Sequence, residues 1–419
     1  MCHRVVFDSR QRRYSLWAEA VQDDHALKQV TQSPTDPGFV QNPYPFYRDI
    51  RALGDFVFWE DFGLPMATTA AAVNAVMRHP KLGRQVPEDQ RAEVPENLKP
   101  FYDIEVHSLL ELEPPSHTRI RKLLLRAFTG SRVRAMAPVI RSIVDELISD
   151  FPDTEFDLLD AFARPLPVRV ISRLLGVPDD VGPQLLSWSN AMVAMYQARR
   201  NAEIEASAVA ASVGFSEFVQ SIIYERRKAL GTDLISDLIR AEVDGQRMSR
   251  DEVVSTTILL LNAGHEATVH SLGNSVRMLV DFSNRNESLK DRCIEGAVEE
   301  CLRFDPPLHM FRRWVYEDVS ILGHDFAAGD EIGCLLGSAC RDNAVWKDGD
   351  SFDPLRPKQT NVAFGAGIHF CIGAPLARLE MQIALPALLQ RCPKLKIAET
   401  PKVANLYHFR GLEKLMVTV

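Results

Sequence analysis

The chain has 419 residues, of which 46% are hydrophobic and 25% are charged, and its formal net charge at pH 7 is −8. These values are typical of a soluble globular protein with a large core, and they argue against a disordered chain and a nucleic-acid partner. No stretch approaches the roughly 18 consecutive apolar residues of a membrane span, and the polar, Arg-rich start lacks the apolar region of a secretory signal. We therefore predict a cytoplasmic protein.

Composition divides the chain into a short leader and one large domain. We expect residues 1–30 to form a polar, poorly ordered leader and residues 31–419 to form a single domain, because no internal repeat or low-complexity linker interrupts them. The seven cysteines are an odd number without a C-x-x-C pair, which argues against a disulfide framework and a structural zinc site.

Apolar residues at three- and four-residue spacing predict that helices dominate the middle of the chain. The expected helices span residues 117–128, 132–150, 158–175, 202–229, 232–243 and 250–281, and short strands are expected near residues 56–59, 314–322 and 415–419. The fold is therefore predicted to be mainly α with minor β.

The longest expected helix begins with a capping box. Ser249 and Glu252 have the spacing at which each side chain accepts from the other residue's backbone amide. From Val253 to Val280 the sequence then runs as one largely apolar segment of about 30 residues. A helix this long and this apolar must lie buried through the centre of the molecule.

The most informative segment is the glycine-rich stretch FGAGIHFCIG, from Phe364 to Gly373, which leads into a predicted helix with Pro375 in its first turn. Glycines such as Gly365 let the backbone approach a bulky flat group and let amide N–H groups point at the sulfur of Cys371. A thiol just before a helix N-terminus lies in positive dipole potential, which favours the thiolate. A lone thiolate is a poor zinc site but a good axial ligand for iron that a macrocycle already holds.

This segment resembles the heme-binding loop of the cytochrome P450 superfamily, in its soluble bacterial type, with Cys371 at the position of the thiolate ligand. The resemblance runs from about Asp36 to the C-terminus. It implies a single-domain cytochrome P450 fold in which the long central helix and the cysteine loop flank heme b, iron protoporphyrin IX. Cys371 would be the metal ligand, and Phe364, Gly365 and Gly373 would lie against the cofactor.

Two further sets of residues match the family. Glu300 and Arg303 match its E-x-x-R signature, and at i and i+3 on a helix they share one face and are expected to form a structural ion pair. The two heme propionates would need cations or hydrogen-bond donors in a buried pocket. The side chains that match the family pattern for this role are His117, Arg121, Arg313 and His369.

The stretch AGHEAT within the long helix resembles the family's oxygen-activating motif A-G-x-D/E-T-T. Ala263 and Gly264 open one face of the helix, and Glu266 falls on the acid position, but Ala267 stands where most members have a threonine. Thr268 is offset by about 100° around the helix, so it does not simply replace that hydroxyl. Two interpretations stay open: water relays protons from Glu266 with help from a substrate hydroxyl, or the enzyme couples poorly to dioxygen, uses peroxide or performs other heme-thiolate chemistry.

Alignment with the family predicts a substrate pocket that is mainly apolar. Its candidate residues are His265, Met192, Met195, His309, Phe311, His408 and Phe409. Among them, the two imidazoles of His265 and His309 are the side chains that could bind a substrate oxygen.

The resemblance implies a monooxygenase that inserts one atom of dioxygen into a small lipophilic molecule, such as a terpenoid, polyketide or aromatic. The sequence carries no recognisable flavin or iron-sulfur module, so a separate ferredoxin would supply electrons. Residues 119–134 carry six basic residues and no acid, a face that could steer a ferredoxin toward the thiolate side. The six are Arg119, Arg121, Lys122, Arg126, Arg132 and Arg134.

We expect the protein to be a monomer. Two alternative functions stay open at this point: a heme-thiolate protein that binds a ligand or senses a gas without turnover, and a peroxide-driven heme enzyme.

Overall fold

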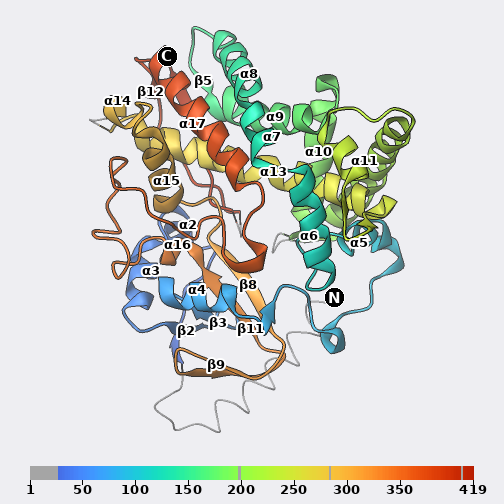
Figure 1. Cartoon of the computed structure of the whole chain (residues 1–419). Coiled ribbons are helices and arrows are strands. Elements are labelled where there is room, and N and C mark those ends of the chain that lie inside the picture. Colours follow the sequence, from blue (N-terminus) through green and yellow to red (C-terminus); the bar gives the residue numbers. More distant parts are fainter. Residues whose placement is uncertain (1–26, 197–199, 283–284, 407–408) are drawn as a thin grey trace.

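The computed structural model describes residues 27–196, 200–282, 285–406 and 409–419 (Figure 1). Helices make up most of this part of the chain, which confirms the predicted class, mainly α with minor β. The α-helices are α2 (Pro37–Gln41), α3 (Tyr44–Arg51), α4 (Ala70–Arg78), α5 (Lys99–Glu105), α6 (Ser116–Ala127), α7 (Gly130–Ala135), α8 (Ala137–Ser149), α9 (Pro165–Leu175), α10 (Gly182–Val193), α11 (Ala202–Lys228), α12 (Leu234–Arg240), α13 (Arg250–Leu279), α14 (Arg285–Ser288), α15 (Ile294–Phe304), α16 (Leu336–Ala339) and α17 (Ala374–Arg391). The 3₁₀ turns are η1 (Glu88–Gln90), η2 (Glu96–Leu98), η4 (Asp179–Val181), η5 (Ala194–Tyr196) and η6 (Gly367–His369), and η3 (Leu159–Ala163) is a π-helix.

The strands form one larger sheet and several small ones. The larger sheet has the order β1-β2-β3-β11-β8-β4, and β5, β12 and β13 form a three-stranded sheet. Their bounds are β1 (Lys28–Val30), β2 (Phe56–Trp59), β3 (Leu64–Ala67), β4 (Leu82–Gly83), β5 (Phe156–Asp157), β8 (Met310–Val315), β11 (Glu331–Leu335), β12 (Lys396–Ile397) and β13 (Met416–Thr418). Two hairpins complete the set, β6 (Glu242–Val243) with β7 (Gln246–Arg247), and β9 (Val319–Ile321) with β10 (His324–Phe326).

The end of the expected leader is part of the fold. We predicted a poorly ordered segment up to residue 30, whereas Lys28–Val30 forms β1 and pairs in parallel with β2, with Lys28 opposite Val57. The prediction was wrong for these residues because their backbone groups pair with a strand far along the chain. Residues 1–26 lie outside the described part.

Prolines interrupt two of the expected helices. The expected helix 132–150 is divided into α7 and α8 at Met136, and Pro138, in the first turn of α8, has no N–H to continue the preceding helix. The expected helix 158–175 consists of η3 followed by α9, which begins at Pro165.

Two other expected elements end earlier than predicted. The helix expected over residues 232–243 ends at Arg240, and its last two residues instead form β6. The strand expected over residues 314–322 is two strands, because β8 ends at Val315 and β9 begins at Val319.

The predicted central helix is α13, which has 30 residues and crosses the middle of the molecule (yellow in Figure 1). Its capping box is present as predicted: the Ser249 side chain accepts from the Glu252 amide, and the Glu252 side chain accepts from the Ser249 amide. Buried side chains lie along its whole length, and it packs against α9, α10, α11, α15 and α17. The sequence therefore predicted both where this helix begins and that it lies in the core.

Helix α11 alone among the described helices is long and apolar enough, by length and composition, to cross a membrane. The same test is passed by core helices of soluble proteins. One side of α11 is buried at Phe215, whose ring stacks on that of Trp188 in α10 at 5.3 Å. This side of the helix therefore serves the protein core.

Candidate active site

The glycine-rich loop requires glycine at two positions. Gly365 and Gly367 both have φ of +73°, a region that other residues rarely adopt. A Cβ atom on Gly367 would lie 2.3 Å from the backbone oxygen of Met77 in α4, and a Cβ on Gly365 would lie 3.4 Å from the ring of Phe311. The loop can therefore lie against α4 and β8 only because these positions carry no side chain, and this contact places Cys371 at the entrance of α17.

The sulfur of Cys371 lies close to backbone amides, as predicted. Burial raises the pKa of the Cys371 thiol, while hydrogen bonds from the amides of Gly373 and Ala374 and the charge of Arg121 act in the opposite direction. The prediction that the helix N-terminus alone favours the thiolate is wrong for the chain without a metal, because burial outweighs these effects. A cation bound to the sulfur would reverse that balance, since a coordinating thiol loses its proton.

Buried cationic or neutral basic side chains gather near the loop. The rings of His117 and His369 lie 4.4 Å apart, and Arg313 is 1% exposed with Nη1 donating to the Arg312 carbonyl at 2.8 Å. Burial, together with the charges of His369 and Arg121, lowers the pKa of His117 to about 4, and neither ring nitrogen of His117 has a partner among the described residues. A heme propionate would supply the partner that the His117 ring lacks.

The other predicted propionate contacts are held in place by the protein itself. His369 Nε2 lies 2.9 Å from Glu113 Oε1. Arg121 donates to the carbonyl oxygen of Phe370 at 2.7 Å, so its guanidinium lies beside the residue that precedes Cys371. The structure thus brings three of the four predicted residues, with Arg121 next to them, to the side of the cysteine loop, and this arrangement fits a heme.

Sequence reasoning missed two charged residues of this cluster. Arg84 lies over the Phe311 ring at 5.8 Å, and its charge acts on Arg313. Glu113 accepts from the Arg84 amide at 2.6 Å as well as from His369. Neither residue belonged to a motif quoted for the chain. One signal was available for Glu113, because it precedes His117 by four residues and both groups can therefore share one side of a helical turn.

The oxygen-activating stretch of α13 contains an unpartnered acid. Burial raises the pKa of Glu266 to about 7, and its Oε2 has no hydrogen-bond partner among the described residues. Ala263 is exposed although it lies midway along the central helix. Gly264 packs against Ile171, which a Cβ would approach to 3.4 Å. The helix therefore presents small residues and one neutral or charged carboxyl, as the sequence predicted.

The two hydroxyl-related positions behave differently from a threonine relay. Thr268 is buried, and its hydroxyl lies 3.4 Å from the Gly264 carbonyl oxygen of its own helix. The Ala267 carbonyl accepts from Ser271 Oγ at 2.8 Å. One turn further, His270 is buried with both ring nitrogens unpartnered in the described part, and a Cβ on Gly411 would lie 1.8 Å from its Nδ1. The sequence analysis did not single out His270, because a lone histidine in a helix carries no motif.

The candidate pocket residues fall into two groups. Met192 and Met195 are buried, and Met192 Sδ lies 3.8 Å from Asn262 Nδ2 on α13. His265 Nδ1 lies 2.9 Å from the Leu261 carbonyl oxygen, and burial lowers the pKa of His265 and leaves Nε2 without a partner. Phe311 lies beside the cysteine loop and the ring of Phe409 lies 5.6 Å from that of His270, whereas His408 lies outside the described residues.

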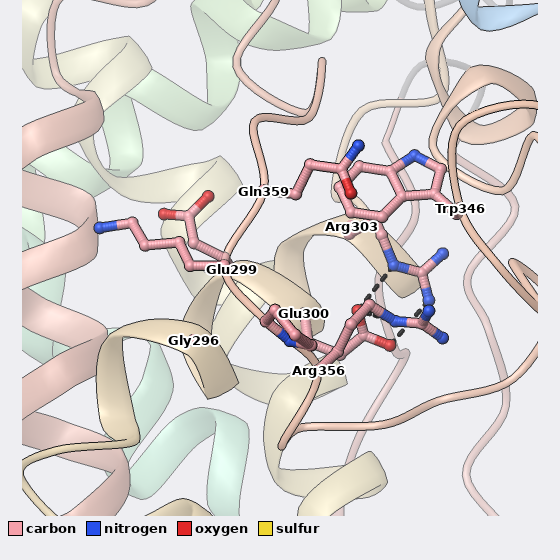
Figure 2. A pocket seen from close by; sticks show the side chains of 9 residues that line it. Gly296, Glu299, Glu300, Arg303, Trp346, Arg356 and Gln359 are labelled. Carbon is pink, nitrogen blue, oxygen red and sulfur yellow. Dashed lines mark hydrogen bonds and ion pairs between the residues drawn. The ribbon is translucent and has the colours of Figure 1, made fainter.

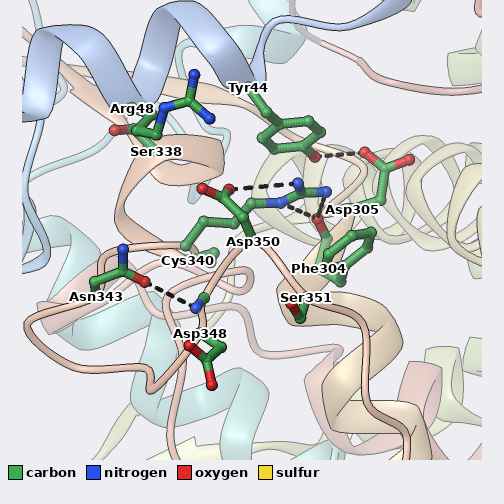
Figure 3. Close-up of polar contacts among 12 residues, drawn as sticks. Tyr44, Arg48, Phe304, Asp305, Ser338, Cys340, Asn343, Asp348, Asp350 and Ser351 are labelled. Atoms are coloured by element: carbon green, nitrogen blue, oxygen red, sulfur yellow. Dashed lines mark hydrogen bonds and ion pairs between the residues drawn. The ribbon is translucent and has the colours of Figure 1, made fainter.

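His309 is a prediction that the structure corrects. Its ring nitrogens lie 3.3 Å from Tyr44 Oη and 3.2 Å from Tyr47 Oη, and burial lowers its pKa to about 3. Figure 3 shows the neighbouring contact, in which Tyr44 Oη donates to Asp305 at 2.5 Å. Both ring nitrogens are thus engaged with α3, so His309 holds α3 to the segment after α15 and has no nitrogen left for a substrate.

The predicted Glu300–Arg303 ion pair is present in a small polar pocket beside α15 (Figure 2). Arg303 Nε and Nη2 each donate to a Glu300 oxygen at 2.7 Å, and both side chains are at most 2% exposed. Arg303 Nη1 also donates to the carbonyls of Cys340 and Gly349, at 2.8 Å each. This two-pronged pair therefore ties α15 to the long segment that leads to the cysteine loop.

Known proteins resemble the chain over most of its length. The family model described as Cytochrome P450 matches residues 292–410, which contain the ion pair and the cysteine loop. The "Cytochrome P450 monooxygenase PikC" of Streptomyces venezuelae is 35% identical over 402 residues, which cover 90% of this chain and 91% of that protein. The "Polyketide biosynthesis cytochrome P450 PksS" of Bacillus subtilis is 36% identical over 331 residues, which cover 77% and 80%.

A solved structure agrees with these likenesses. The chain matches "P450BioI in complex with hexadec-9Z-enoic acid ligated Acyl Carrier Protein" with a TM-score of 0.85 and 30% identity, over 91% of this chain and 99% of that one. The fold and the cysteine loop thus define a heme-containing oxygenase. The chain belongs to the cytochrome P450 family and is a monooxygenase of its bacterial type.

Proposed function

We propose that the chain holds heme b through the Cys371 thiolate and inserts one atom of dioxygen into a small lipophilic molecule, with electrons from a ferredoxin. When bound, the heme supplies the oxygen chemistry: two electrons and two protons reduce dioxygen, one oxygen atom enters a substrate C–H bond and the other leaves as water. The observation that carries the proposal is the position of Cys371, beside two backbone amides and near the unpartnered nitrogens of His117. His117, Arg313 and His369 would hold the propionates.

Glu266 is the proposed proton donor. Burial sets its pKa at about 7, so the carboxyl can both hold and release a proton near neutral pH, as an acid catalyst requires. Ala267 offers no hydroxyl, and the Thr268 hydroxyl faces a carbonyl of its own helix. Water would therefore carry the proton from Glu266 across the space beside Ala267.

Ala267→Thr tests this route. If the native substrate and water relay the proton, the added hydroxyl leaves the yield of product per electron unchanged or lowers it, because the methyl group displaces relay water. A large gain in that yield would show instead that the parent protein lacks a needed hydroxyl. Ala263→Ser, one turn earlier, adds a hydroxyl of similar size to the same helix and serves as the matched control.

The proposed substrate is a lipophilic molecule of terpenoid, polyketide or aromatic type. The buried side chains of Met192 and Met195 and the ring of Phe409 offer apolar contact, and His265 Nε2 offers a single polar one. The names of two similar proteins mention polyketide biosynthesis and an acyl chain on a carrier protein, which supports a substrate of this class.

The proposed electron donor is an acidic ferredoxin that docks on the cysteine-loop side. Two of the basic residues of segment 119–134 are occupied, since Arg119 pairs with Glu252 and Arg132 with Asp237. Arg121 links this segment to the cysteine loop through the Phe370 carbonyl. The exposed basic residues that remain are Lys122, Arg126 and Arg134, and the exposed apolar residues beside them are Leu125, Ile368 and Phe370.

Arg126→Glu tests the docking surface. We expect the rate of reduction by ferredoxin to fall at least tenfold and to lose most of its dependence on salt, because the steering charge is reversed. Arg48→Glu, an equally exposed change on α3 away from α6 in Figure 1, should leave the rate unchanged. Equal rates for the two variants would overturn docking at this surface.

One incubation distinguishes the proposed function from its alternatives. A surrogate ferredoxin system with a panel of lipophilic compounds should give substrate-stimulated reduction and hydroxylated product. Product with peroxide but not with ferredoxin would indicate a peroxide-driven enzyme. Reduction without product across the panel would indicate a ligand-binding or sensor protein. We further propose that the protein acts in the cytoplasm as a monomer.

A further inference from the structure

Glu113 joins three segments that are far apart in the sequence. It lies in the loop before α6, and its side chain is 11% exposed. Its Oε1 accepts from His369 Nε2 at 2.9 Å and from the backbone amide of Arg84 at 2.6 Å. One carboxylate oxygen therefore fastens the loop before α6, the end of β4 and the cysteine loop together.

The absence of a side chain at residue 83 makes room for this carboxylate. A Cβ atom on Gly83 would lie 2.3 Å from Glu113 Oε1 and 2.5 Å from Tyr316 Oη, distances that real Cβ atoms do not adopt. Gly83 does not have a positive φ, so the need for glycine here comes from the close approach alone. The contact of Glu113 with His369 thus depends on a matching feature of a separate strand.

Glu113 is also an acid among the groups proposed to hold the heme propionates. Its charge acts on His117 and on Arg313, and its partner His369 is only 7% exposed. The protein's own carboxylate therefore shares these basic groups with the two carboxylates of the cofactor. In a buried site such a charge is screened less than it would be in water.

We propose that Glu113 is a positioning residue for the heme, which holds the His369 ring toward a propionate and adds a negative charge that lowers the reduction potential of the iron. The inference rests on the proposed function, because it requires heme bound through Cys371. His369 stands two residues before Cys371, so fixing its ring also restrains the backbone that carries the ligand. A nearby negative charge favours the ferric state, which carries one more positive charge than the ferrous state.

The test compares Glu113→Gln with Glu111→Gln in the heme-loaded protein. Both changes remove one charge from the same loop, but Glu111 is 37% exposed in its side chain and its ion pair at 3.4 Å is with Arg84 rather than His369. We expect Glu113→Gln to shift the one-electron reduction equilibrium about tenfold toward the ferrous state, a rise of about 59 mV. Glu111→Gln should shift it less than threefold. Equal shifts in the two variants would overturn the electrostatic half of the proposal.

A second variant tests positioning without a change of charge. Gly83→Ala forces Glu113 away from its place, and we expect transfer of heme to an acceptor protein to accelerate about tenfold, as for other residues that orient a metal ligand. Glu113→Asp keeps the charge and should keep the potential of the parent protein. A rate of heme transfer in Gly83→Ala equal to that of the parent would overturn the positioning half.

The carbon monoxide spectrum of the reduced parent protein separates the two levels of failure. If the parent shows no thiolate signature, the proposed function falls. If the parent shows it and both tests above are negative, only the role of Glu113 falls. Should Glu113→Gln unfold, circular dichroism of the heme-free chain will reveal it, and the Glu113→Asp and Gly83→Ala measurements still decide.

Discussion

Two buried regions of the molecule treat their polar groups in opposite ways. Behind the cysteine loop, Glu300 is held by two hydrogen bonds from Arg303, and Asp305 is paired with two arginines and accepts a bond from a tyrosine. On the central helix α13, the Oε2 of Glu266 and both ring nitrogens of His270 have no partner among the described residues.

The difference indicates what each region is for. A buried charge with several partners in the protein can hold segments together, whereas a buried polar group without partners costs stability. Such a group persists where something else supplies its partners, such as a cofactor, a substrate or ordered water. The first region therefore serves the fold and the second serves the chemistry, and changes to the two regions should affect stability with opposite signs.

The largest effect is expected from Arg303→Ala. This change leaves Glu300 buried and also frees the carbonyls of Cys340 and Gly349, so we expect the free energy of unfolding to fall by about 3–5 kcal/mol. Denaturant titration of the parent and the variant measures it. The matched control is Glu295→Gln, which breaks the exposed pair with Lys358 on the same helix and should cost below about 1 kcal/mol. Equal losses in both variants would contradict a fold-holding role for the buried pair.

A smaller and pH-dependent effect is expected at Asp305. Burial opposes its ionisation, but the charges of Arg410 and Arg277 outweigh burial and hold the pKa of Asp305 well below its usual range. A lowered pKa in the folded state gives stability that is present above the ordinary carboxyl pKa and is lost as the pH falls below it. Asp305→Asn should therefore cost about 3 kcal/mol at pH 7 and less at pH 3. Thermal melting at both pH values measures this, and a loss that does not shrink in acid would contradict it.

The opposite sign is expected at Glu266. Its pKa, raised by burial to about 7, means that the unfolded chain loses this proton first, so stability falls as the pH rises from about 4.5 to 7. Glu266→Gln removes this loss and should stabilise the heme-free chain at pH 8 by about 1–2 kcal/mol, with little effect at pH 4.5. The same change should lower product formation in the loaded enzyme at least tenfold. A variant less stable than the parent at pH 8 would show that Glu266 belongs with the structural charges.

The features that could be predicted from the sequence are those encoded by short spacings. The capping box of Ser249 and Glu252, the Glu300–Arg303 pair and the glycines around Cys371 all lie within a few residues of their partners, so local geometry fixed the prediction. The break at Met136 was missed because the apolar period continues through it while Pro138 removes an amide.

The features that were missed depend on contacts between distant segments. Glu113 and His369 are 256 residues apart, and no local pattern could bring them together. His309 was assigned to the pocket from alignment, but its partners Tyr44 and Tyr47 lie more than 260 residues earlier in the chain. Distance in sequence therefore separates what the sequence predicts from what only the fold reveals.

The central claim is that the sulfur at residue 371 binds the heme iron. The most direct test is the carbon monoxide difference spectrum of the reduced, heme-loaded protein, recorded for the parent and for Cys371→Ser. We predict the red-shifted band of a thiolate-ligated heme in the parent and its complete loss in the variant, with Cys392→Ser, a change to another described cysteine on the far end of α17, unaffected. The same thiolate band in Cys371→Ser, with undiminished turnover, would contradict the account.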